Sequence, residues 1–321
     1  MTRDAPINPT RRAAVRSGQA LAVCCLALCI LTGCEQAVPD LPPAAGLPPA
    51  GANLEQHWGA YLDTLAGVPL QDGCEPFYRT PPPEIRRRGT VLMLHGFISC
   101  PQQYDELAEL AAANGFVALV PLLPGHGRIN PAFDRDDTRD LSTPDRWQAD
   151  FYPFVARMNR IMAAADGDRV LVALSLGSAT GILAMLEDRT LYDRALLFVP
   201  FLGMPGGPLA SAFAGTLGLT PLLRETSVGA LGWRRICLPK REQGRAGYCD
   251  YSFKHLVAIN RLANQVHARS TEPPPLDLPL QVAAVDGDAS VSAARIRTFF
   301  DAVEPTGSAG ICVFPDDVKH S

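Results

Sequence analysis

The sequence predicts an α/β protein with a mostly parallel, doubly wound sheet. Short apolar runs without polar alternation recur along the chain, and such runs are typical of strands buried on both faces. Segments with helical spacing of apolar residues separate them, which is the order that a parallel sheet covered by helices requires. The 321 residues are 47% hydrophobic and 19% charged, so the chain can bury the core of a large domain.

A lipoprotein signal peptide is predicted at residues 1–33. Four arginines precede an apolar run that ends at Leu31 and is too short to span a bilayer comfortably. The run closes with Leu31-Thr32-Gly33-Cys34, which resembles the lipobox of bacterial lipoproteins. The resemblance implies cleavage before Cys34, lipidation of its thiol, and a location in the bacterial cell envelope, anchored on the periplasmic or outer-membrane side. An ordinary secretory signal is the alternative.

Residues 34–53 are predicted to be a tether, because a segment rich in Pro, Ala and Gly buries too little apolar surface to fold.

The folded domain is expected over 54–321. Thr143 is predicted to cap a long helix that has Pro144 at its first position. The predicted helices are 54–65, a helix beginning near Pro101, the helix from Thr143, 176–188, 252–268 and 291–303. The predicted strands are 90–95, 116–120, 169–174, 195–199, 280–285 and 310–314.

A lid-like insertion is predicted at about 201–251, after the sixth strand. The region is rich in Gly and Pro and has no clean hydrophobic period, and long irregular segments in compact domains are usually functional. Its apolar residues are candidates for lining an acyl group or for packing the lid itself.

Charge and cysteine content exclude some classes of function. A net charge of −4, without clustered Lys and Arg, argues against nucleic acid binding. Of the nine cysteines, five lie beyond Cys34, and an exported chain permits disulfides. A bond between Cys237 and Cys249 is the first expectation and Cys74–Cys100 the second, because sequence alone does not fix connectivity. The histidine and cysteine spacing does not fit a metal site.

Ser175 is the candidate nucleophile. The apolar run from Val170 ends at Ala173-Leu174-Ser175-Leu176-Gly177, which predicts a strand that turns sharply into a helix with the serine at the bend. Small neighbours let the backbone fold back tightly around such a hydroxyl. The pattern for this turn is Gly-x-Ser-x-Gly, so Ala173 replaces one glycine. An alanine is tolerated there if its packing neighbour is small.

A serine hydroxyl needs a histidine that takes its proton and an acid that orients the histidine. Asp286 and Asp288 follow a predicted strand, at the edge where open α/β sheets place their sites, and capping of the next helix is the alternative for each. His320 follows the last predicted strand. His255 and His267 fall in or near a helix, where surface or lid positions are the simpler interpretation.

The order of a serine turn, a late aspartate and a final histidine resembles the α/β-hydrolase superfamily, as do His95-Gly96-Phe97 and Pro124-Gly125-His126-Gly127 after successive strands. The resemblance covers about residues 85–320. It implies Ser175 as nucleophile, Asp288 as acid, His320 as base, and the N–H groups of Phe97 and Leu176 as the oxyanion hole. Such chemistry requires no cofactor and no metal. A subset of exported esterase-like members also carries a cysteine and a proline soon after the His-Gly pair.

These features predict a serine hydrolase that cleaves carboxylic esters, including lipid or acyl esters, through an acyl-enzyme. A thioesterase or lysophospholipase with the same triad is one alternative, and a non-catalytic envelope lipoprotein on a hydrolase scaffold is another. The family normally packs a last helix after the histidine loop, whereas His320 is the penultimate residue here. We therefore expect a longer natural chain or a weakly held His320, with part of one sheet face left exposed.

Overall fold

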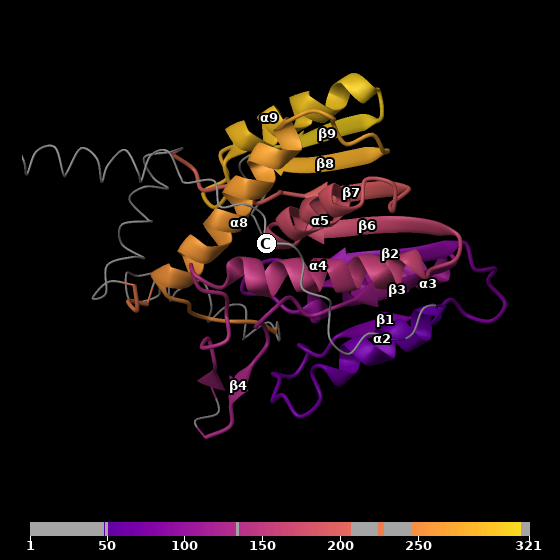
Figure 1. Cartoon of the computed structure of the whole chain (residues 1–321), viewed down its shortest axis with the longest axis horizontal. Helices are drawn as coiled ribbons and strands as arrows, with labels where there is room; N and C mark the ends of the chain where they lie inside the picture. Colours follow the sequence, from indigo (N-terminus) through magenta and orange to yellow (C-terminus); the bar gives the residue numbers. More distant parts are fainter. Residues whose placement is uncertain (1–47, 49–50, 133–134, 207–223, 228–245, 316–321) are drawn as a thin grey trace, which may run out of the picture. The chain divides into compact units, whose positions relative to one another are not determined.

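A computed structural model of the chain describes residues 48, 51–132, 135–206, 224–227 and 246–315. A seven-stranded sheet with strand order β1-β3-β2-β6-β7-β8-β9 forms its centre (Figure 1). Strand β1 pairs antiparallel with β3, and the other neighbours in the sheet are parallel. The strands are β1 (Phe77–Arg79), β2 (Gly89–Leu94), β3 (Phe116–Val120), β6 (Asp168–Leu174), β7 (Arg194–Phe198), β8 (Leu280–Val285) and β9 (Ala309–Phe314). Strands β4 (Ile129–Asn130) and β5 (Arg135–Asp136) form a separate pair.

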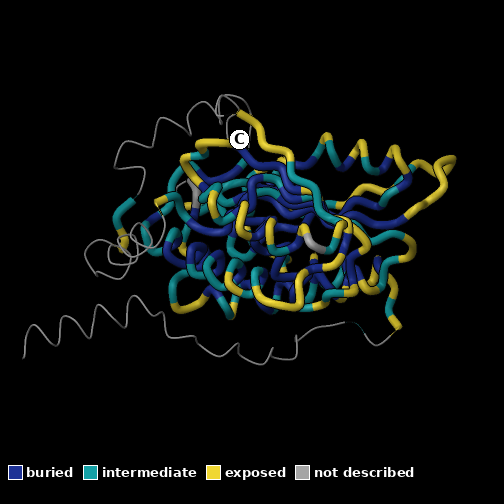
Figure 2. Tube along the Cα trace, turned by 90° about the horizontal axis from the view of Figure 1, so that it is seen from above, coloured by how far each residue is buried: buried dark blue, intermediate teal, exposed yellow. Residues whose placement is uncertain are grey.

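Helices cover both faces of the sheet, so the predicted fold class is confirmed. The larger core joins one face of the sheet to α2, α4, α5, α8 and α9, and α3 packs on the opposite face over β2 and β3. The strands form the buried layer between the helices (Figure 2). The helices are α2 (Leu54–Asp63), α3 (Asp105–Ala113), α4 (Trp147–Ala163), α5 (Leu176–Glu187), α8 (Phe253–Thr271) and α9 (Ala293–Val303), with short 3₁₀ turns at Pro101–Tyr104 and Glu304–Thr306.

The face that carries α3 is less covered farther along the sheet. Leu196 and Phe198 of β7 are only half-buried, although they pack at the margin of the smaller core. Val313 and Phe314 of the edge strand β9 are exposed.

The prediction that Thr143 caps α4 is wrong. The helix begins at Trp147 with Arg146 as its N-cap residue. The Thr143 hydroxyl instead donates to the Asp145 carboxylate at 2.7 Å, and the Thr143 carbonyl accepts from the Trp147 N–H at 3.1 Å. A local side-chain bond therefore replaces the expected cap, as is common for Ser, Thr, Asn and Asp near helix starts.

The predicted insertion follows β7, which is the fifth strand of the described sheet along the chain rather than the sixth. Most of residues 201–251 lie outside the described residues, and the same holds for the predicted signal peptide 1–33 and most of the tether 34–53. Among the helices that the structure describes, none is both long and apolar enough to cross a membrane.

Candidate active site

Strained backbone marks the carboxyl edge of the sheet at three neighbouring strands. In the described chain, the non-glycine residues with positive φ are Ile98 (58°), Ser175 (53°) and Val199 (42°). They follow the carboxyl ends of β2, β6 and β7, which are adjacent in the sheet. Such conformations cost free energy and are concentrated at functional sites, so this edge is the candidate site.

Ser175 occupies the sharp turn between β6 and α5, as predicted. Its backbone angles are φ 53° and ψ −114°, and its side chain is largely buried. The turn is held by hydrogen bonds from the Ser175 N–H to the Phe198 carbonyl (2.9 Å) and from the Phe201 N–H to the Ser175 carbonyl (3.0 Å). Strand β7 and the segment after it therefore fix the turn from one side.

Small residues explain why the sequence accepts this turn. A Cβ atom at Gly177 would overlap the carbonyl oxygens of Leu94 and His95, so α5 approaches β2 too closely for any larger residue. Ala173 is fully buried, and a Cβ atom built at Gly181 would lie 3.5 Å from the Ala173 Cβ. The neighbour that makes room for Ala173 is thus a glycine in α5, and the departure from the Gly-x-Ser-x-Gly pattern is accommodated by packing.

The predicted oxyanion donors lie on both sides of Ser175. Leu176 is the next residue, at the start of α5, and Gly96 is a packing neighbour of the serine, since a Cβ atom on it would be in van der Waals contact with the Ser175 Cβ at 3.6 Å. Within the described part of the chain, the backbone N–H groups of Phe97 and Leu176 donate no hydrogen bond. Two donors without an acceptor therefore lie beside the serine, which is the arrangement that an oxyanion hole needs.

His95 orients the peptide that carries the Phe97 N–H. The Leu123 N–H donates to Nε2 of His95 at 3.0 Å, so the proton is on Nδ1, which donates to the Gly96 carbonyl at 2.9 Å. The Ser99 N–H donates to the same carbonyl at 3.2 Å. Because the C=O and N–H of a trans peptide point in opposite directions, anchoring the Gly96 carbonyl directs the Phe97 N–H the other way.

His126, from the Pro-Gly-His-Gly loop, packs against this histidine. Its ring lies 5.3 Å from the His95 ring and 5.8 Å from the Phe97 ring, and Nδ1 is 3.0 Å from the Pro124 carbonyl. Burial lowers the pKa of His95 to about 3 and the pKa of His126 to about 4. Both rings are therefore neutral near pH 7 and act through hydrogen bonding and packing.

The two candidate acids lie in the loop after β8, two strands from β6. Asp286 is exposed, and its N–H donates to the Phe314 carbonyl at the end of β9. Asp288 is half-buried, and its Oδ1 accepts from the N–H groups of Ser290 (2.6 Å) and Val291 (3.0 Å). Both carboxylates thus lie at the edge that carries Ser175. The predicted base, His320, lies outside the described residues, and so does Cys34.

Several residues that hold the site gave no signal in the sequence. Gln103 accepts from the Gly96 N–H at 3.0 Å, and Tyr248 donates its backbone N–H to the Ile98 carbonyl at 2.9 Å. The Tyr248 ring lies 6.1 Å from the His126 ring, and Tyr251 lies 4.9 Å from Phe97. Polar and aromatic residues of these types are common in helices and loops, so only the fold reveals their roles.

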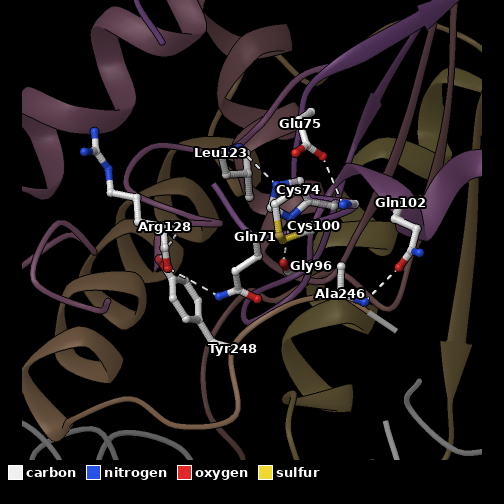
Figure 3. The surroundings of a disulfide bond; sticks show 12 residues. Gln71, Cys74, Glu75, Gly96, Cys100, Gln102, Leu123, Arg128, Ala246 and Tyr248 are labelled. Carbon is white, nitrogen blue, oxygen red and sulfur yellow. Dashed lines mark hydrogen bonds between the residues drawn. A yellow bond between two sulfur atoms is a disulfide. The ribbon is translucent and has the colours of Figure 1, made fainter. Parts of the chain in front are cut away.

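A disulfide joins Cys74 to Cys100, the second of the two pairings expected from the sequence. Cys100 follows the Phe97 loop and precedes the turn at Pro101, and Figure 3 shows its bond to Cys74. Both half-cystines are fully buried. Cys237 lies outside the described residues, so a Cys237–Cys249 bond stays a prediction.

Comparison with known proteins identifies the class. A sequence model of the alpha/beta hydrolase family matches residues 91–309, and the chain belongs to this family. No curated protein sequence matches the chain.

Solved structures with the same fold include two lipases and an esterase. The monoacylglycerol lipase of Paleococcus ferrophilus has a TM-score of 0.55 and 16% identity, covering 75% of this chain and 89% of its own. A carboxyl esterase from Bacillus coagulans has a TM-score of 0.55 and 15% identity, with 75% and 84% covered. A monoglyceride lipase from Saccharomyces cerevisiae has a TM-score of 0.51 and 12% identity, with 76% and 83% covered. At these identities the likeness concerns the fold.

Proposed function

We propose that the protein is a serine hydrolase that cleaves carboxylic esters through an acyl-enzyme at Ser175. The observation that carries this proposal is the strained Ser175 turn with two N–H donors beside it, those of Phe97 and Leu176. The names of the compared structures, two lipases and a carboxyl esterase, support an ester as the substrate class.

In the proposed reaction, the Ser175 hydroxyl attacks the ester carbonyl while His320 accepts its proton. His320 then returns the proton to the leaving alcohol, and water hydrolyses the acyl-enzyme in the same way. Asp288 holds the imidazole tautomer, and the N–H groups of Phe97 and Leu176 bind the oxyanion. Asp288 is favoured over Asp286 because it is half-buried and already ordered by two backbone N–H groups.

The segment after β7 is proposed to line the acyl side. Phe201 is buried and is tied to Ser175 through its N–H, and Leu202 is fully buried next to it. Apolar residues that adjoin the Ser175 turn favour an apolar acyl group.

Hydrolysis of p-nitrophenyl acyl esters by the full chain tests the proposal, with Ser175→Ala as the inactive variant. We expect turnover that the substitution abolishes. Equal turnover by both proteins, or none by folded wild-type protein, would favour the non-catalytic scaffold instead. Matched oxygen esters, thioesters and lysophospholipids in the same assay distinguish the esterase from a thioesterase or a lysophospholipase.

We also propose that lipidated Cys34 anchors the enzyme to the cell envelope. The lipobox-like sequence supports this, and the buried Cys74–Cys100 disulfide fits an oxidising compartment. Partition into a detergent phase and metabolic labelling with palmitate test it in cells. Wild-type protein should label, and Cys34→Ala should not; equal labelling of both proteins contradicts the anchor.

A further inference from the structure

Ile98 has a backbone conformation that β-branched residues rarely adopt. Its φ is 58°, and it is the third residue of the turn Gly96–Ser99, which the Ser99 N–H closes onto the Gly96 carbonyl. A positive φ at the third position of a turn normally calls for Gly or Asn. The turn that carries Phe97 therefore stores strain, which its surroundings must hold in place.

Two contacts with the 246–248 segment hold this turn from one side. The Tyr248 N–H donates to the Ile98 carbonyl at 2.9 Å, and Gly247 lies so close to that oxygen that a Cβ atom would overlap it. The Ala246 N–H donates to Gln102 Oε1 at 2.7 Å (Figure 3). These contacts fix where the Ile98 carbonyl points.

The disulfide holds the turn from the other side. Cys100 follows Ile98 by two residues and is bonded to Cys74, and the Gln102 N–H donates to the Gly73 carbonyl at 3.1 Å. The loop of Cys74 is itself anchored, because the Gln71 N–H donates to the Gly127 carbonyl at 2.8 Å. Gly127 packs directly on Cys74. The covalent bond thus ties the strained turn to the Pro-Gly-His-Gly loop.

We propose that the Cys74–Cys100 disulfide is a positioning element for the oxyanion hole: it keeps Ile98 at positive φ and thereby holds the Phe97 N–H beside Ser175. Relaxation of Ile98 to an extended conformation with negative φ opens the Gly96–Ser99 turn and withdraws the Ser99 N–H from the Gly96 carbonyl. That carbonyl belongs to the peptide that carries the Phe97 N–H, so this peptide loses one of the two hydrogen bonds, from Ser99 and His95, that orient it beside Ser175. The proposal rests on the proposed ester hydrolysis for its catalytic consequence only.

The test compares the wild-type full chain with a disulfide-free variant that carries both Cys74→Ala and Cys100→Ala. We expect kcat to fall by about 10-fold or more, approaching the loss of an oxyanion donor, with KM nearly unchanged. In this background Ile98→Gly should restore much of kcat, because glycine accepts positive φ without strain. Ile98→Val, which keeps the β-branch, is the matched control and should restore none.

Unchanged kcat in a folded disulfide-free variant would overturn the proposal, as would equal effects of the Gly and Val substitutions. If the variant does not fold, two other measurements decide. Reduction of the folded wild-type protein, followed by thiol titration and circular dichroism, should lower kcat as the two thiols appear. Gly247→Ala, with the disulfide intact, should lower kcat by displacing the Ile98 carbonyl. Unchanged kcat in both measurements overturns the proposal.

A double-mutant cycle on unfolding separates this proposal from the proposed function. If the wild-type protein does not hydrolyse esters, the proposed function fails, but the coupling between the disulfide and Ile98 is still measurable by denaturant unfolding. The change in unfolding free energy caused by Ile98→Gly should be more favourable with the disulfide than without it. Only the disulfide-bonded turn holds Ile98 in a strained conformation that glycine relieves. Additive effects would contradict the proposal whatever the activity.

Discussion

The backbone N–H of Leu123 donates a 3.0 Å hydrogen bond to Nε2 of His95, and this bond decides which nitrogen of the buried ring carries the proton. Nδ1 is left to donate to the Gly96 carbonyl. The loop after β3 therefore fixes the tautomer of His95. This tautomer in turn orients the Gly96–Phe97 peptide, which carries the Phe97 N–H.

His95→Leu and His95→Asn test this dependence. Leucine removes both ring contacts, whereas asparagine retains a donor near the position of Nδ1. We expect kcat to fall by about 100-fold for leucine and clearly less for asparagine, because only leucine removes the side-chain hydrogen bond to the Gly96 carbonyl and leaves the Ser99 N–H to hold it. Both should lose about 1–3 kcal/mol of stability, because the buried Leu123 N–H is left without an acceptor. Steady-state kinetics and urea unfolding provide the two measurements, and equal kcat for the two variants would contradict the positioning role.

Gly177→Ala and Ala173→Gly form a second pair, at the two small positions of the serine turn. A Cβ atom at Gly177 overlaps the Leu94 and His95 carbonyls, so Gly177→Ala should be severely destabilised and inactive. Ala173→Gly restores the family pattern, but it should gain no activity and should lose about 0.5–1 kcal/mol, as glycine does within strands. Higher kcat for Ala173→Gly would show that the alanine is a defect and not an accommodated substitution.

Asp288→Asn and Asp286→Asn test which carboxylate orients His320 in the proposed triad. The amide cannot hold the productive imidazole tautomer, so Asp288→Asn should lower kcat by about 10⁴-fold with little change in KM. Asp286 is exposed, and Asp286→Asn should change kcat by less than about threefold. The reverse order of losses would assign the acid to Asp286.

The stability of the protein in acid should depend on His126. Burial lowers its folded-state pKa to about 4, from an ordinary value of 6.5. Between these two pH values the unfolded chain binds a proton that the folded chain excludes, so stability falls as pH drops through this window and levels off below it. His126→Asn should therefore reduce the slope of unfolding free energy against pH by up to about 1.4 kcal/mol per unit. An unchanged slope would mean that the folded protein protonates His126 freely.

The strands could be predicted where they are buried on both faces. The run at 116–120 and the run at 280–285 were predicted with the bounds of β3 and β8, because continuous apolar residues admit few other structures. Strand β1 has three residues, two of them exposed, and so produces no such pattern. The sequence does not predict the start of α4, because it does not reveal whether the Thr143 hydroxyl bonds to the Asp145 carboxylate or caps the helix.

The candidate site could be predicted only in part. Ser175, Phe97 and Leu176 meet at one edge because strand ends in a parallel sheet converge, and the sequence shows where strands end. The left-handed conformation of Ile98 had no signal, because a β-branched residue is a poor candidate for positive φ. The sequence favours Cys74–Cys100 only as the second of two pairings, since pairing depends on which loops meet in space. His320 lies outside the described residues, so its role stays a prediction.

Labelling with a fluorophosphonate probe tests whether Ser175 is an activated nucleophile. The probe bonds to an activated serine, and mass spectrometry of the digested protein identifies the modified residue. We expect one adduct on Ser175 in the wild-type full chain and no adduct in Ser175→Ala. No adduct on folded wild-type protein, or equal labelling of the two proteins, would contradict it.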